Sequence, residues 1–79
     1  MLTKADVVKA RETINRRYPN VSVYVAENWW HGTEVPEYRV SLVDLNAEPS
    51  CSAHQGLDLL TTTEYAMRNW KRDHSECTN

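Results

Sequence analysis

The 79-residue sequence contains no phenylalanine, only two glycines and only two cysteines. Glycine-rich loops that cradle phosphates need several glycines close together, so this class of nucleotide site is excluded. Two cysteines do not make a disulfide framework, and in a reducing compartment both are expected to be thiols. No apolar run approaches the roughly 18 residues of a membrane span, and charged residues interrupt the first turn where a secretory signal would lie. We therefore expect a small soluble, cytoplasmic protein with no cofactor.

The length predicts a single domain over residues 1–79, with residues 74–79 as a frayed tail. Its hydrophobic fraction of 41% and charged fraction of 25% are ordinary for a globular chain. A core of this size supplies only a few kcal/mol of net stability. The composition therefore indicates a folded domain with no room for a large cofactor cavity.

Charge is distributed unevenly along the chain. The net charge is −2, which disfavours a dedicated nucleic-acid binder. Residues 1–18 carry five basic and two acidic side chains, whereas residues 19–60 carry one basic and six acidic side chains. The first segment is thus basic and the middle of the chain is acidic.

The stretch from Val21 to Leu45 predicts a β-hairpin. Alternating side chains lie on opposite faces of a strand, and Pro36 suits the start of the returning strand. One face is uniformly apolar and is assigned to the core: Val21, Val23, Val25, Tyr38, Val40 and Leu42. The other face is mixed and is expected to be partly open to water: Ser22, Tyr24, Ala26, Arg39, Ser41 and Val43.

Helices are predicted over residues 4–17 and 62–73. The first follows a Thr3 cap and stops before Pro19, with apolar residues at helical spacing. The second follows Thr61-Thr62-Thr63-Glu64, which has the spacing of a capping box. Residues 51–59 are harder to interpret, and we expect part of them to form a third strand.

These elements predict an α+β fold in the order α-β-β-(β)-α, with two helices packed on one face of an antiparallel sheet. The expected core consists of Val7, Ile14, Val21, Val23, Val25, Val40, Leu42, Leu60, Met67 and Trp70.

The adjacent pair Trp29-Trp30 is the most distinctive surface feature. Neighbouring residues in extended backbone cannot both point into a one-sided core, so at least one indole should be exposed. One alternative places one indole in the core and folds the other over the loop as a lid. The other makes the tip a site for a partner, because tryptophan is enriched in binding hot spots. The candidate partner-binding residues are Tyr24, Trp29, Trp30, His31 and Arg39.

Two cysteines and two histidines form the pattern Cys51-x-x-His54 and His74-x-x-Cys77. These residue types are zinc ligands, and a Cys51–Cys77 disulfide or two unconnected thiols are the alternatives. The spacing alone leaves the three open, and we assign no metal site.

No pairing of nucleophile and base or of acid and base stands out, so we expect a protein that is not an enzyme. The order of elements is similar to that of double-stranded-RNA-binding domains. Those modules depend on a basic start to the second helix, where this chain has Thr61-Thr62-Thr63-Glu64. We therefore do not assign the chain to them.

The sequence thus favours a small protein-binding or regulatory factor, an inhibitor or accessory protein, acting through an aromatic, acidic hairpin. Its partner is expected to be a protein with a basic surface. A small acidic domain of this kind also suits an inhibitor or accessory factor encoded by a phage or a mobile element. Homodimerisation through the open face or an edge strand is a companion expectation. The alternative is a nucleic-acid-binding module that uses the basic helix predicted over residues 4–17 or the open face of the sheet.

Overall fold

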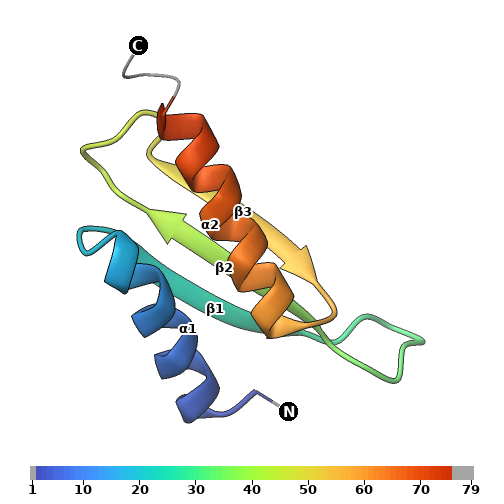
Figure 1. Ribbon diagram of the computed structural model, residues 1–79. Helices are drawn as coiled ribbons and strands as arrows, with labels where there is room; N and C mark the ends of the chain where they lie inside the picture. The colour runs from blue at the N-terminus through green and yellow to red at the C-terminus, as the bar shows by residue number, and fades with distance from the viewer. Residues whose placement is uncertain (1, 76–79) are drawn as a thin grey trace.

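A computed structural model describes residues 2–75 of the chain (Figure 1). The elements follow in the order α1 (Lys4–Arg17), β1 (Ser22–Asn28), β2 (Glu37–Val43), β3 (Cys51–Gly56) and α2 (Leu59–Ser75). This confirms the predicted α+β order, including the third strand. Both helices lie on one face of the sheet, and the β1–β2 loop extends beyond them (Figure 1).

Helix α1 has the bounds that its sequence predicts. The Thr3 hydroxyl accepts a hydrogen bond from the Asp6 amide, and the Asp6 carboxylate accepts one from the Thr3 amide, both at 3.1 Å. This capping box pairs amides that would otherwise lack an intrahelical acceptor. At the other end the Tyr18 amide donates to Ile14, and Pro19 prevents a further turn.

The sheet is antiparallel throughout, with β2 between β1 and β3. Val23 pairs with Leu42 and Val25 with Val40, so the apolar residues of the hairpin share the face beneath the helices. In β3 that face receives Ser52, His54 and Gly56, which are opposite Leu42, Val40 and Tyr38. The hairpin therefore supplies most of the sheet's contribution to the core.

The core forms where the helices cross this apolar face. Its buried members are Ile14, Val21, Val23, Val40, Leu42, Ala66 and Trp70, and Val25 and Met67 pack against it partly buried. Val7 is also partly buried. Leu60 was predicted to be in the core, but its side chain is 58% exposed, so that prediction is wrong.

The cause is the start of α2, which lies at Leu59 and not at residue 62. Asp58 provides the cap, because its carboxylate accepts hydrogen bonds from the Thr61 amide at 2.9 Å and the Thr61 hydroxyl at 2.7 Å. The earlier start places Thr62 and Thr63 in the buried face and rotates Leu60 away from it. Their hydroxyls are satisfied by the carbonyls of Asp58 and Leu59.

The predicted tail over residues 74–79 lies mostly outside the described residues. Of it, the structure describes His74 and Ser75, which form the end of α2.

Candidate functional site

The loop of residues 29–36, which we call the tip, carries three large apolar side chains in water. Trp29 is 57% exposed, Trp30 53% and Val35 57%. Neither indole lies in the core, so the alternative in which one tryptophan is buried is wrong. Pro36 is buried and fixes the point at which the chain returns to β2. The tip therefore presents apolar surface on a projection of the domain (Figure 1).

A hydrogen-bonded turn orders the tip. The Thr33 amide donates to the Trp30 carbonyl at 3.1 Å, and the Thr33 hydroxyl donates to the same carbonyl at 2.7 Å. Gly32, the third residue of this turn, has φ +85°, as a type II turn requires. Glycine adopts this conformation without a steric penalty, so a side chain at position 32 would strain the turn.

Glu27 ties the tip to the start of the chain. Its carboxylate accepts a hydrogen bond from the Trp29 indole at 2.9 Å and another from the Leu2 amide. Both hydrogen bonds lower the pKa of Glu27 below its ordinary value, and the bond from Trp29 has the larger effect. The indole of Trp29 is thus held in one orientation while more than half of its surface remains in water.

Three carboxylates lie within or beside the tip: Glu27, Glu34 and Glu37. The tip itself contains no lysine or arginine, and His31 is exposed. Aromatic surface surrounded by negative charge suits a partner that combines an apolar pocket with basic residues.

The structure places the other two predicted residues elsewhere. Tyr24, 62% exposed, and Arg39 are diagonal neighbours on the open face of the sheet, because Tyr24 pairs with Ser41 and Ala26 with Arg39. Tyr24 is five residues before Trp29, about 16 Å along an extended chain. The five predicted residues therefore form two patches, the tip and the middle of the open face.

The open face is otherwise lined mostly by small or polar side chains, including Ser22, Ala26, Ser41 and Ala53, with Val43 partly exposed at the end of β2. Strand β1 ends at Asn28, so strand periodicity does not extend to Trp30. Tyr24 is the one aromatic residue of the three strands on this face, which gives a nucleic-acid base a single ring to stack on.

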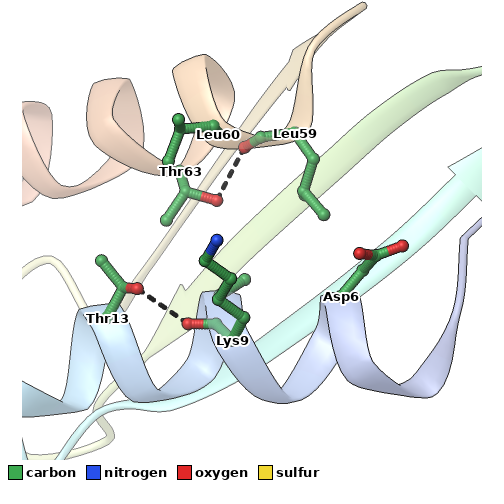
Figure 2. Close-up of a pocket in the computed structure, with 7 residues that line it drawn as sticks. Asp6, Lys9, Thr13, Leu59, Leu60 and Thr63 are labelled. Carbon is green, nitrogen blue, oxygen red and sulfur yellow. Dashed lines mark hydrogen bonds between the residues drawn. The ribbon is translucent and has the colours of Figure 1, made fainter.

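A further feature, the α1–α2 seam, was not predicted from the sequence. Near the helix N-termini it contains a hollow of about 150 Å³ between Ala10, Thr13, Leu59 and Thr63, and the Lys9 side chain reaches across it toward α2 (Figure 2). Farther along, the seam is lined by Arg16 and Arg17 of α1 and by Arg68 and Lys71 of α2, with Glu64 among them.

Within residues 2–75, none of these four cations forms an ion pair. The two helices each contribute half of the basic cluster, and their residues are about fifty positions apart in the chain. Only the tertiary packing brings them together, so no local pattern could reveal the cluster. Val35 was also missed, although its place in a loop beside charged residues indicates exposure.

The cysteine and histidine pattern does not converge in the described residues. Cys51 and His54 are three positions apart in β3, so their side chains lie on opposite faces of the sheet. His54 faces Asn69, at 3.4 Å, whereas His74 contacts the carbonyls of Trp70 and Pro49 at 2.7 and 2.9 Å. No group of three potential metal ligands occurs in residues 2–75, and Cys77 lies outside that range.

In the same residues, neither helix has the length and apolarity to cross a membrane. Comparison of the chain with protein-family models, with curated proteins and with solved structures finds no match.

Proposed function

We propose that the protein is a non-enzymatic binding factor that docks the tip onto a protein partner. The observation that carries the proposal is the exposure of Trp29 and Trp30, each above one half, on an ordered loop. Burying exposed apolar side chains lowers the free energy of a complex. Tryptophan provides a large apolar area, and few rotatable bonds have to be fixed when it binds. In this role the indoles enter an apolar pocket of the partner.

The order of the tip supports this role. Binding a flexible loop would cost conformational entropy, whereas the turn at Gly32 and the Glu27–Trp29 hydrogen bond have already restricted the tip. The carboxylates of Glu34 and Glu37 favour a basic rim on the partner and speed its approach at low salt. A partner that continues past the tip onto the open face would also reach Tyr24 and Arg39.

The test is a pull-down from a host lysate, in which the proteins captured by the immobilised wild-type protein are compared with those captured by a Trp29→Ala/Trp30→Ala variant. Leu45→Ala is the control, because Leu45 is an exposed apolar residue in the loop between β2 and β3, outside both the tip and the β3 edge. We expect one protein to bind the wild type and the control, with affinity reduced about 30-fold or more in the tip variant, the loss typical of a hot spot. Equal binding by all three proteins would disprove the role of the tip.

A second candidate function, binding to a nucleic-acid backbone, is favoured by the four cations of the seam. Arginine donates in pairs to phosphate oxygens, and three of the four are arginines. Retention on heparin should then fall with salt and weaken in an Arg16→Ala/Arg68→Ala variant. A protein that is not retained at low salt would rule out this function, and the tip variant should behave as wild type in this assay.

A further inference from the structure

The two edges of the sheet differ in how their backbone groups are used. The Asp44 amide donates to the Ser50 carbonyl at 2.8 Å, which continues the β2–β3 register by one pair. Asp44 and Ser50 are thus a hydrogen-bonded pair, and such pairs alternate with non-hydrogen-bonded pairs along an antiparallel sheet. Every second residue after Ser50 therefore bonds to β2 through its backbone: Ser52, His54 and Gly56. The backbone groups of the residues between them, Cys51, Ala53 and Gln55, point outward.

The β1 edge is partly occupied. By the same alternation Val21 points outward there, and its carbonyl accepts a hydrogen bond from the Asn15 side chain at 2.7 Å. The Val21 amide donates to the Tyr18 carbonyl at 3.2 Å. Glu27 adds a charge near the end of this strand, which discourages further pairing.

The β3 edge has none of these protections. Its sequence, CSAHQG, contains no acidic residue, lysine, arginine or proline, the residues that usually block edge-to-edge pairing. Within residues 2–75, no other segment hydrogen-bonds to the outward backbone groups of Cys51, Ala53 and Gln55. Their side chains are exposed on the open face.

We propose that β3 pairs with β3 of a second copy of this chain, antiparallel and about a twofold axis at Ala53. In this register Ala53 is opposite Ala53 of the second copy, and Cys51 is opposite Gln55. It is the one register that pairs all three outward residues of each strand. Each of these pairs exchanges two backbone hydrogen bonds, and the two sheets become one continuous sheet.

The surroundings of the edge suit a second copy. Leu57 and Tyr65 are both more than half exposed, and together with His54 and Thr61 they line a hollow beside β3. The Tyr65 ring is 6.4 Å from that of His54, so it lies close to the proposed axis. Pairing places the two α2 helices on the same side of the joined sheet, where these apolar side chains of the two copies face each other. Strand β3 itself is uncharged, and the charged side chains beside it include both signs: Asp58 lines the same hollow, and the Arg68 guanidinium lies 5.8 Å from the centre of the Tyr65 ring.

Molar mass in solution, measured by light scattering during gel filtration, is the first test. We expect twice the 9.2 kDa of the chain, and a monomer at high protein concentration would overturn the proposal. Ala53→Pro removes an outward amide and no bond to β2, so it should give a monomer with a native circular-dichroism spectrum. If proline disrupts the fold, Ala53→Glu places two like charges at the axis with the same expected result. Ser41→Glu, on the same face of the central strand, should remain a dimer.

Cross-linking tests the register. In a Cys77→Ser background, Gln55→Cys places a thiol opposite Cys51 of the second copy. The Cα atoms of such a pair lie about 5.5 Å apart, within the range that a disulfide spans. We expect a covalent dimer on mild oxidation, and none from Arg39→Cys on the central strand. A dimer that survives Ala53→Glu, or that fails to cross-link through Gln55→Cys, would exclude this interface. If the protein is a monomer and extended peptides bind to β3, the dimer proposal is wrong and the partner of this edge is a strand from another protein.

Discussion

The two faces of the central strand, β2, differ in burial. On the face beneath the helices, Val40 and Leu42 are completely buried. On the opposite face, Arg39 is exposed, and Ser41 and Val43 are partly buried. Both sets belong to one seven-residue strand. The difference shows that the fold depends on one face, while the other face, the tip and the β3 edge remain available for contacts.

The largest effect is expected on the covered face. Leu42→Ala should lower the free energy of unfolding by about 3 kcal/mol, because it removes buried surface and leaves a cavity. For a domain of this size that is a large part of the total. Ser41→Ala, its neighbour on the open face, should change stability by less than about 0.5 kcal/mol.

Urea denaturation of the two variants measures this difference. If Leu42→Ala does not fold, Leu42→Val gives a smaller loss of about 1 kcal/mol that can still be measured. Similar losses for Leu42→Val and Ser41→Ala would mean that the open face is also packed, and the comparison would fail.

A smaller effect is expected where β3 meets α2. A methyl group added at Gly56 would collide with the Thr62 hydroxyl, which is buried and donates to the Asp58 carbonyl at 2.7 Å. Gly56→Ala should therefore destabilise the domain by about 1–2 kcal/mol, the cost of overpacking.

The cause of that loss is tested by Thr62→Ala. The double variant should be more stable than the sum of the two single changes predicts, with a coupling energy of about 1 kcal/mol. Additive effects would show that Gly56 is needed for a reason other than contact with Thr62.

The smallest effect concerns the Asp58 cap. Hydrogen bonds from the Thr61 hydroxyl and then the Thr61 amide lower the pKa of Asp58 below its ordinary value of 3.8. A lowered pKa in the folded state stabilises the fold above the ordinary value, and this contribution is lost as pH falls through the lowered one. Asp58→Asn keeps a good cap but does not titrate, so its melting temperature should fall less steeply in acid.

Melting curves collected from about pH 6 to about pH 2 provide the measurement. Glu12→Gln, an exposed change on α1 outside the basic cluster, should follow the wild-type curve. Parallel curves for Asp58→Asn and wild type would show that this carboxylate does not contribute to the acid dependence.

The sequence predicts those parts of the fold in which local signals agree. Thr3, Asp6 and Pro19 all indicate the same bounds for α1, and the hairpin alternates without interruption. The predicted start of α2, residue 62, was wrong because the sequence offers two good N-cap residues, Asp58 and Thr61, three positions apart. The structure uses the first and buries Thr62 and Thr63, which sequence reasoning assigned to the helix start.

The candidate site divides in a similar way. Two adjacent tryptophans beside a one-sided core predict that at least one indole is exposed, so part of the tip could be predicted. Both are exposed because β1 ends before the pair, and strand alternation does not describe them. The basic cluster of the seam could not be predicted, because Arg16 and Arg68 meet only through helix packing. The separation of Tyr24 from the tip also depends on where β1 ends, and a single asparagine, Asn28, is too weak a signal to fix that end.

The contact between Leu2 and Glu27 has a practical consequence for affinity tags. Because the Leu2 amide bonds to the carboxylate that also holds Trp29, a tag fused ahead of residue 2 emerges beside the tip. Helix α2 ends at the opposite end of the sheet (Figure 1). Immobilisation through the start of the chain would therefore crowd the surface proposed to bind, whereas attachment after α2 leaves it facing the solution.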